Sequence, residues 1–419
     1  MSTGCLSSNL CSPSSLKCVA PVAARGGLIV KSHEMLAGSG INGDSDMAST
    51  QVKATTSKAV VDRTVPIDTS FDRAPAYLDE MPELIGWDRK SYPTGWFQVA
   101  WSDEIAPGVV RPLKYFGKDF VLYRTEGGEA VLQSAFCPHM GAHLGFGGHV
   151  RGDRIVCPYH GWEWGCDGRN KLVPSDGRPS GANRALRNYP TAETSGIVWM
   201  WHDVLHRAPM WDPPCDYSKD EEYLPVWPHT VHKTPNVRLQ PQWVAENTVD
   251  VDHLLFVHQS KVIPTLASER TPVRYSNDGH IWRNDREHPL QSSHVEGVGV
   301  AIITVPRDPD QPRRVPSVLI SATTPIDEDH SDFFHTNLIL QDKEAEGGEG
   351  LVPVGRAARR VATFTEQGTR DMPIWANMAY INRPAYSSSE GVFRKFRKWC
   401  DQFYPDVDAD ASSNATAKG

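Results

Sequence analysis

Two cysteine–histidine pairs in the middle of the chain have the residue types and spacing of metal ligands. The first pair is Cys137-x-His139 and the second is Cys157-x-x-His160, with seventeen residues between the pairs. Two thiolates and two imidazoles can hold a structural zinc ion. However, the Cys-x-His spacing puts a thiolate and an imidazole on one tight loop tip, and nearby glycines let the backbone fold around a larger object. We therefore favour a two-iron, two-sulfur cluster over zinc, with the Cys pair on one iron and the His pair on the other.

The segment from Cys137 to His160 resembles the Rieske motif of the ring-hydroxylating, non-haem iron oxygenases, with the four candidate ligands at the matching positions. Respiratory-chain Rieske proteins carry two further cysteines that cross-link the cluster loops. The corresponding positions here hold Ala142 and Tyr159, which favours the oxygenase branch. Two aromatic residues that follow the motif are expected to pack beneath the cluster: Trp162 and Trp164.

A second candidate metal site follows in residues 246–258, which read ENTVDVDHLLFVH. A pair of histidines on a helix is most often structural. Here, however, the predicted iron-sulfur cluster needs a site to which it can pass electrons. The stretch also resembles the mononuclear-iron motif of the same oxygenase family, which makes His253 and His258 candidate iron ligands. Five positions on an ideal helix would turn the second imidazole away from the first. We therefore expect the helix to end, or to widen as a π-turn, near residues 255–257.

The third iron ligand is expected to be a carboxylate from farther along the chain, because two histidines and one carboxylate form the facial triad of non-haem iron. Asp371, in the stretch RDMPIW, resembles the downstream ligand segment of the family. Asp371 also stands two residues before Pro373, which suits the N-cap of a following helix, and it could serve both purposes. Asp252 and Glu366 are rival ligands, but Asp252 would point elsewhere on a helix and Glu366 lacks the surrounding match.

The resemblance gives Asp250 a different role. In the family, an aspartate at this position hydrogen-bonds a cluster histidine of a neighbouring subunit and a histidine of the iron site. Carried over, Asp250 would bridge His160 of one chain to His253 of the next; the alternative is a solvated helix carboxylate. Asp250 and His253 are three positions apart and are expected to share a helix face. Asn247, one turn earlier, is expected to approach the iron pocket.

The resemblance implies the terminal oxygenase component of a Rieske-type monooxygenase. Its cofactors would be one [2Fe-2S] Rieske cluster and one mononuclear Fe(II), with dioxygen as the cosubstrate. The chain has no evident glycine fingerprint for a flavin or NAD, so NAD(P)H would act only through a separate flavin or ferredoxin-type reductase. Electron transfer between neighbouring chains implies a head-to-tail ring, and the family resemblance suggests a homotrimer.

Residues 92–205, together with residues 246–258 and 366–375, look most like the 3-ketosteroid 9α-hydroxylase oxygenase group. The stretches that carry this likeness include Asp167-Gly168-Arg169, Lys171-Leu172-Val173-Pro174 and Trp201-His202-Asp203. The likeness implies a bulky, polycyclic and apolar substrate, with a steroid as the first choice. Hydroxylation, demethylation or desaturation of an aromatic, alkaloid or sterol substrate stays open. A non-catalytic iron-sulfur electron carrier is the alternative from a different class.

The pattern of elements around these sites predicts an α+β protein. Short strand patterns separated by turns in residues 92–205 predict a small antiparallel β domain that presents the cluster loops. Residues 206–405 alternate strands with helical stretches near 356–380 and 392–403, which predicts a larger catalytic domain with an antiparallel sheet flanked by helices. Residues 74–91 are expected to pack on this core.

The ends of the chain have another character. Residues 1–73 read as a disordered leader or extension, and residues 406–419 as a disordered tail. Residues 1–46 are Ser-rich and acid-poor like a transit peptide, but Met47 also looks like an ordinary start, so a cytoplasmic location and organelle import are both open. The net charge of -8 speaks against a nucleic-acid partner. No apolar run reaches the ~18 residues of a transmembrane helix.

Overall fold

The computed structural model describes residues 81–406, apart from residues 88, 90, 220, 251, 260–272, 287–291, 309, 311–312 and 388–389. The leader predicted over residues 1–73 lies outside the described residues, as do residues 74–80 and 407–419. Within residues 81–87, Trp87 packs on the core: its ring lies 4.8 Å from that of Tyr380 and 6.4 Å from that of Trp243, measured between centroids.

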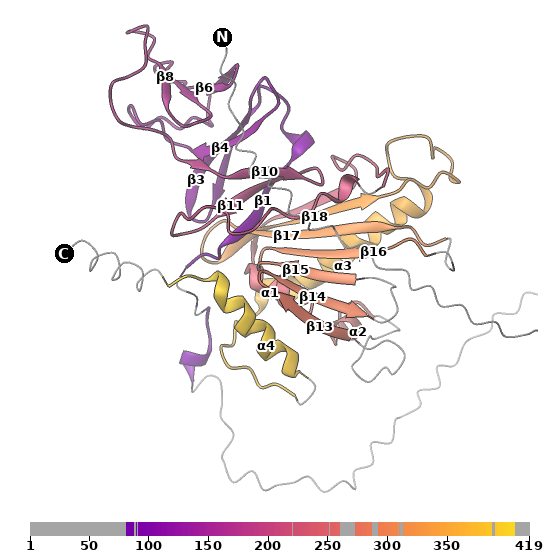
Figure 1. The fold of residues 1–419 in the computed structure, drawn as a ribbon. Helices are drawn as coiled ribbons and strands as arrows, with labels where there is room; N and C mark the ends of the chain where they lie inside the picture. Colours follow the sequence, from indigo (N-terminus) through magenta and orange to yellow (C-terminus); the bar gives the residue numbers. More distant parts are fainter. Residues whose placement is uncertain are drawn as a thin grey trace, which may run out of the picture.

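The first half of the described chain forms small antiparallel sheets (Figure 1). One sheet has the order β1-β11-β10, a second β2-β3-β4-β9 and a third β5-β6-β7-β8. Their strands are β1 (Gly95–Trp101), β2 (Val110–Tyr115), β3 (Lys118–Arg124), β4 (Ala130–Ser134), β5 (His149–Arg151), β6 (Arg154–Val156), β7 (Glu163–Gly165), β8 (Asn170–Leu172), β9 (Asn188–Tyr189), β10 (Thr191–Thr194) and β11 (Ile197–His202). The third sheet carries the loop with the second Cys/His pair between β6 and β7.

The second half forms one large antiparallel sheet with the order β12-β18-β17-β16-β15-β14-β13, and helices lie beside it (Figure 1). Its strands are β12 (Val231–Arg238), β13 (Val273–Asp278), β14 (Ile281–Arg286), β15 (Ser292–Glu296), β16 (Val300–Val305), β17 (Ser317–Pro325) and β18 (His330–Ile339). The helices are α1 (Pro241–Glu246), α2 (His253–Phe256), α3 (Gly355–Asn377) and α4 (Gly391–Cys400), and short 3₁₀ turns are η2 (Pro82–Leu84), η3 (Ser102–Glu104), η4 (Tyr217–Lys219) and η5 (Asp401–Phe403). The predicted fold class, antiparallel sheets with a small β domain and a larger helix-flanked domain, is confirmed.

The two faces of the large sheet have different partners, because side chains alternate between the faces along each strand. One face packs on the tryptophan-rich strands of the first half; the ring of Phe334 lies 5.4 Å from that of Trp101. The opposite face receives α3, whose Phe364 is buried with Leu319 and Val305. We refer to this second face as the helix face.

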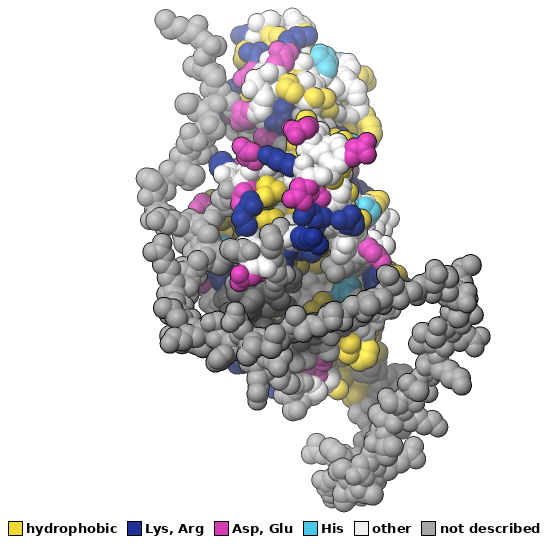
Figure 2. Space-filling view, turned by 90° about the vertical axis from the view of Figure 1, so that its right-hand side faces the viewer, with side chains coloured by type: hydrophobic (Ala, Val, Ile, Leu, Met, Phe, Trp, Pro, Cys, Tyr) yellow, Lys and Arg dark blue, Asp and Glu magenta, His cyan; other side chains and the backbone are white. Residues whose placement is uncertain are grey.

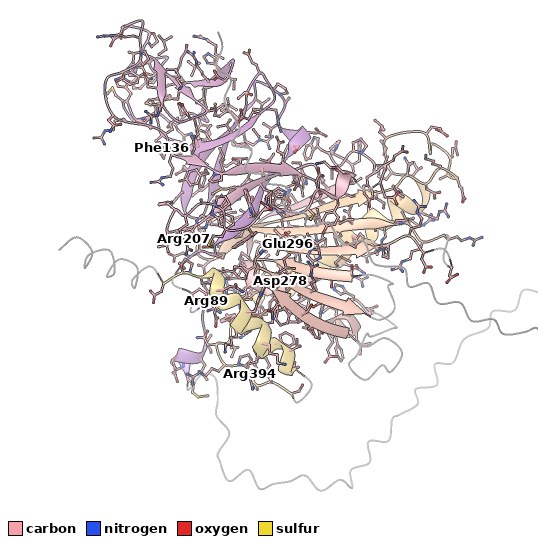
Figure 3. All side chains as sticks on the ribbon, viewed as in Figure 1. Arg89, Phe136, Arg207, Asp278, Glu296 and Arg394 are labelled. Atoms are coloured by element: carbon pink, nitrogen blue, oxygen red, sulfur yellow. The ribbon has the colours of Figure 1, made fainter. Side chains whose placement is uncertain are left out.

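Hydrogen bonds fix the two halves to each other. The hydroxyl of Tyr115 donates to the buried carboxylate of Asp332 at 2.8 Å. The indole N–H of Trp101 donates to Thr336 at 2.8 Å. In Figure 3, Phe136 marks the end of the molecule that holds the cluster loops, and Arg394 marks α4 beside the large sheet. None of the described helices combines the length and the apolar character that crossing a membrane requires.

Candidate metal centres

The two loops that carry the Cys/His pairs have the same backbone geometry. In each loop, the N–H of a glycine donates to the carbonyl of the cysteine four residues earlier: Gly141 to Cys137 at 2.9 Å, and Gly161 to Cys157 at 3.0 Å. The φ angles of these glycines are 77° and 69°, a left-handed conformation that favours glycine. The matched turns explain why a glycine follows each cysteine by four residues.

The four candidate cluster ligands divide into buried thiols and exposed imidazoles. Cys137 and Cys157 are 2% and 3% exposed, whereas His139 and His160 lie at the surface with their rings 4.7 Å apart. Burial raises the pKa of the Cys137 thiol, and the adjacent Cys157 adds to this effect. Trp162 stacks on the ring of His139 at 4.2 Å, as an aromatic residue packed against the cluster site should. Two neighbouring thiols facing inward and two neighbouring imidazoles facing outward fit a [2Fe-2S] cluster of this type.

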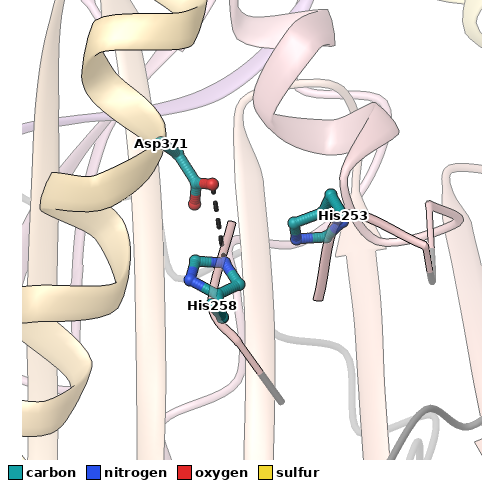
Figure 4. A group of neighbouring side chains, drawn as sticks. All are labelled: His253, His258 and Asp371. Atoms are coloured by element: carbon teal, nitrogen blue, oxygen red, sulfur yellow. Dashed lines mark ion pairs between the residues drawn. The ribbon is translucent and has the colours of Figure 1, made fainter. Parts of the chain in front are cut away.

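The second group brings together residues that are far apart in the sequence (Figure 4). One ligand atom from each of His253, His258 and Asp371 lies within 4.8 Å of the others. Nε2 of His258 is 3.5 Å from Oδ1 of Asp371, and the two imidazole rings are 5.2 Å apart. Their side chains are only 7 to 13% exposed. Two imidazoles and one carboxylate at these separations fit a single iron ion.

Local backbone structure positions each member of this group. His253 opens α2, which ends at Phe256, so the predicted end of the helix before His258 is confirmed. Asp371 lies inside α3 and not at its start, so the predicted N-cap is wrong. Helix α3 continues through Pro373 because the burial of Met372 and other side chains on the sheet outweighs the cost of proline in a helix.

The rival carboxylates do not join the group. Asp252 is exposed and precedes α2, and exposed Glu366 accepts a hydrogen bond from Arg370 at 2.6 Å. Asn247 is the half-buried C-cap of α1, and its side chain is not among the three clustered groups. The described residues therefore offer Asp371 as the carboxylate beside the two histidines.

Asp250 lies in the turn between α1 and α2, so the prediction that it shares a helix face with His253 is wrong. Its Oδ1 accepts the backbone N–H groups of Asp252 at 3.1 Å and His253 at 3.2 Å. Short acidic side chains often bond nearby backbone in this way in place of helix formation. The same oxygen lies 3.8 Å from Nδ1 of His253, close enough for electrostatic attraction but too far for a hydrogen bond.

Electrostatics couple these groups. Burial alone lowers the pKa of His253, but the carboxylates of Asp250 and then Asp371 outweigh burial and raise it. Burial raises the pKa of Asp250, but His253 and the two backbone N–H groups outweigh it, so the net shift is downward. Nδ1 of both His253 and His258 is buried without a hydrogen-bond partner among the described residues. A metal-bound imidazole usually gives its second nitrogen to a carboxylate, and Asp250 is placed to take that role for His253.

One contact near Asp371, between helix α3 and strand β18, was not predicted from the sequence. Gly368 of α3, one turn before Asp371, packs against the buried ring of His335 on β18; a Cβ at position 368 would lie 2.0 Å from Cε1 of the ring. Burial lowers the pKa of His335 to about 3, so this imidazole is neutral. An isolated glycine inside a helical pattern is the signal that could have indicated this contact.

Apolar residues of β16 and β17 lie on the helix face of the sheet, which α3 covers. Ala301 and Ile303 of β16 point to this face and are half-buried, and Leu319 of β17 is buried beside them. Ser321 of β17 pairs in register with Ala301 on one side and His335 on the other.

Comparison with known proteins identifies the two halves of the chain. Residues 95–190 match the Rieske [2Fe-2S] domain, and residues 200–404 match the 3-ketosteroid 9α-hydroxylase C-terminal domain. Cholesterol 7-desaturase nvd of Bombyx mori is 31% identical over 335 residues, covering 75% of this chain and 70% of that protein. A 3-ketosteroid-9-alpha-monooxygenase oxygenase component of Rhodococcus rhodochrous is 26% identical over 339 residues, covering 75% and 80%. The structure of Pseudomonas putida CBB5 NdmA shares the fold, with a TM-score of 0.56 and 19% identity, covering 73% and 88%.

The fold and the two sites therefore define an oxidoreductase, and the chain belongs to the Rieske non-haem iron oxygenases. Within this family it groups with proteins that carry the 3-ketosteroid 9α-hydroxylase C-terminal domain. The cofactors of the enzyme are a [2Fe-2S] cluster and a mononuclear non-haem iron, with dioxygen as the cosubstrate. This membership favours the oxygenase over the zinc and electron-carrier alternatives.

Proposed function

We propose that this enzyme is the oxygenase component of a monooxygenase that oxidises a steroid. The observation that carries the proposal is the convergence of His253, His258 and Asp371 within 4.8 Å, in a chain whose residues 200–404 match the 3-ketosteroid 9α-hydroxylase C-terminal domain. The names of the relatives support the substrate class, since both the cholesterol 7-desaturase and the 3-ketosteroid-9-alpha-monooxygenase component refer to steroids.

The two ligand sets have separate tasks in this proposal. Cys137, Cys157, His139 and His160 hold the cluster, with the thiols inside the protein and the imidazoles at its surface. The triad of His253, His258 and Asp371 holds Fe(II). When bound, these groups supply the reductive activation of dioxygen. The protein contributes position, orientation and the exclusion of water around the reacting carbon.

Asp250 orients His253 within the chain and reaches a cluster histidine of a neighbouring copy in a homotrimer. The 3.8 Å separation from Nδ1 of His253 and the bonds to two backbone N–H groups support the first half of this role, because they hold the carboxylate beside the imidazole. Exposed apolar side chains support the second half. Tyr159 is 62% exposed next to His160, and Phe256 is 78% exposed beside the iron site. A neighbouring copy would cover both.

A separate reductase supplies the electrons. The term "oxygenase component" in the name of the Rhodococcus relative supports this division of labour. Asn247 stays a weaker candidate for the iron pocket, since it is half-buried at the end of α1, three residues before Asp250.

Desaturation is a second candidate reaction, favoured by the 31% identity to a cholesterol 7-desaturase. Hydroxylation and desaturation both break a C–H bond of the substrate, so the same triad can serve either outcome. The product distinguishes them, because a hydroxylated steroid gains an oxygen atom and a desaturated steroid loses two hydrogen atoms.

Oxygen uptake with a surrogate reductase tests the proposal. The enzyme, loaded with iron and cluster, is supplied with a panel of sterols, 3-ketosteroids and small aromatic acids, and products are identified by mass spectrometry. We expect uptake coupled to an oxidised steroid. Products from the small aromatic acids alone would contradict the steroid assignment.

A further inference from the structure

Residues 167–187, which contain β8 and end just before β9, form a basic segment in a chain that is acidic as a whole. The segment has five basic and two acidic side chains, a net charge of +3, whereas the whole chain carries -8. Lys and Arg side chains are visible at this end of the molecule, at the top of Figure 2. Four arginines of the segment are exposed: Arg169, Arg178, Arg184 and Arg187.

The four exposed arginines have no ion pair in the part of the chain that the structure describes. By contrast, Arg124 of the neighbouring strand β3 pairs with Glu193 at 2.7 Å. The ion pair within the basic segment joins Lys171 to Asp167 at 2.6 Å, which leaves Asp176 as the other carboxylate of the segment. The positive charge of the arginines is therefore available to a partner of opposite charge.

The basic segment is attached to both cluster loops. The carbonyl of Arg187 accepts the N–H of Ser134, the last residue of β4 before the first loop, at 2.9 Å. Pro174 lies against Gly161 of the second loop, since a Cβ at position 161 would be 3.2 Å from Cγ of Pro174. These contacts hold the backbone that carries the arginines beside the cluster site.

One side chain of the basic segment is buried with the thiols that hold the cluster. Leu186 is 3% exposed and belongs to the same buried group of side chains as Cys137 and Cys157. Arg184 and Arg187 stand on either side of Leu186 in the sequence and are exposed. An electron carrier that binds these arginines would therefore come close to the cysteine side of the cluster site.

The proposed trimer requires a separate surface for the electron donor. In that assembly, the exposed imidazole of His160 meets Asp250 of a neighbouring copy, so the donor cannot bind at the same place. The basic segment offers an exposed surface beside the cluster loops that does not include the two histidines.

We propose that the basic segment is the docking surface for the electron donor, and that the donor is a ferredoxin-type domain with an acidic surface. The proposal rests on the proposed division into oxygenase component and reductase, and it names the chemistry of the partner. One electron leaves the reduced donor, which is oxidised, and reduces the oxidised cluster at the Cys/His loops. Opposite charges on the two partners speed their encounter and orient them.

Anaerobic stopped-flow reduction tests the proposal without substrate or dioxygen. The full-length enzyme with its cluster oxidised is mixed with an acidic plant-type [2Fe-2S] ferredoxin that has been reduced beforehand, and the visible absorbance is followed. At low salt, Arg178→Glu, Arg184→Glu should lower the second-order rate constant of reduction by roughly 10-fold. Added salt should slow the wild type more than this double variant, because it screens the attraction. Binding of the ferredoxin to the immobilised enzyme should weaken in parallel.

The double variant Arg359→Glu, Lys395→Glu is the matched control. It makes the same change in net charge at exposed residues of α3 and α4, which lie beside the large sheet and not at the cluster loops. Its rate of reduction by the ferredoxin should stay near that of the wild type. Dithionite, a small reductant that needs no docking surface, should reduce the cluster of all three proteins at similar rates.

The outcomes separate this inference from the function on which it rests. If the ferredoxin fails to reduce a wild-type cluster that dithionite reduces, or reduces Arg178→Glu, Arg184→Glu as fast as the wild type, the docking surface is wrong and the oxygenase function stands. An equal loss of rate in the control variant would also overturn it. A change in the oligomeric state of Arg178→Glu, Arg184→Glu, measured by light scattering, would instead assign the segment to contacts between copies. If dithionite reduces no cluster in the wild type, the proposed function itself fails.

Discussion

The contact between Gly368 and His335 gives a sharp prediction, because two effects of Gly368→Ala have opposite signs. Alanine is a better helix former than glycine, and by propensity alone the substitution would stabilise α3 by about 1 kcal/mol. The new Cβ would lie 2.0 Å from Cε1 of His335, whereas ordinary contacts begin at 3.4 Å, so helix and ring must separate by roughly 1.4 Å. The His335 side chain is buried, with 3% of its surface exposed, so it cannot move into solvent without disturbing the sheet.

Overpacking of this kind costs about 1–3 kcal/mol, so after the gain in helix propensity is subtracted we expect the free energy of unfolding to fall by up to about 2 kcal/mol. Asp371 is one turn from Gly368, so the displacement of α3 should also weaken Fe(II) binding at the triad by roughly 10-fold. Denaturant unfolding and Fe(II) titration of protein stripped of its mononuclear iron measure the two effects.

Two further variants control this experiment. Gly391→Ala places a Cβ at the start of α4, where nothing lies within 4 Å, and should leave both stability and iron affinity near the wild type. The double variant Gly368→Ala, His335→Ala removes the ring and should recover iron affinity relative to Gly368→Ala alone. Wild-type stability and wild-type iron affinity in Gly368→Ala would refute the reasoning.

Three other predictions concern separate parts of the molecule. Asp250→Asn should keep the visible spectrum of the cluster and the iron content but lower turnover at least about 10-fold, because the amide cannot replace the negative charge beside His253. Unchanged turnover would count against the role of Asp250. Burial lowers the pKa of His202 to about 4, so its contribution to stability is complete above pH 6.5 and falls by about 1.4 kcal/mol per pH unit as the pH drops toward 4. Denaturant unfolding at pH 7 and pH 5 should therefore show a smaller loss for His202→Gln than for the wild type. Glu246→Ala should lower the free energy of unfolding by about 3 kcal/mol, since it leaves the guanidinium of Arg397 buried without its carboxylate 2.9 Å away; a loss similar to that of an exposed ion pair would contradict this.

The cluster site could be predicted from the sequence because its chemistry is local. Cys137 and His139 belong to one loop tip, Cys157 and His160 to the other, and the turn that each glycine makes depends on residues only four positions apart. The end of α2 between His253 and His258 could be predicted for the same reason, since the two side chains converge only if the helix stops.

The iron site and the packing of α3 could not be predicted in the same way, because they depend on contacts between segments that are distant in the sequence. Asp371 stands more than a hundred residues after His258, and only the resemblance to a family connected them. An acidic residue before a proline suggested a helix start, but the packing of α3 on the sheet carries the helix through that position. The close approach of Gly368 to His335 depends on where α3 lies over β18, which periodicity does not specify.

The central claim is that each chain holds two separate iron centres, one at the Cys/His loops and one at the triad. Measurement of iron and acid-labile sulfide in anaerobically purified wild type and His258→Ala tests it most directly. We predict about three iron atoms and two sulfides per wild-type chain, and about two of each in the variant, with the visible spectrum of the cluster retained. An iron content of about two per chain that His258→Ala leaves unchanged would contradict the account.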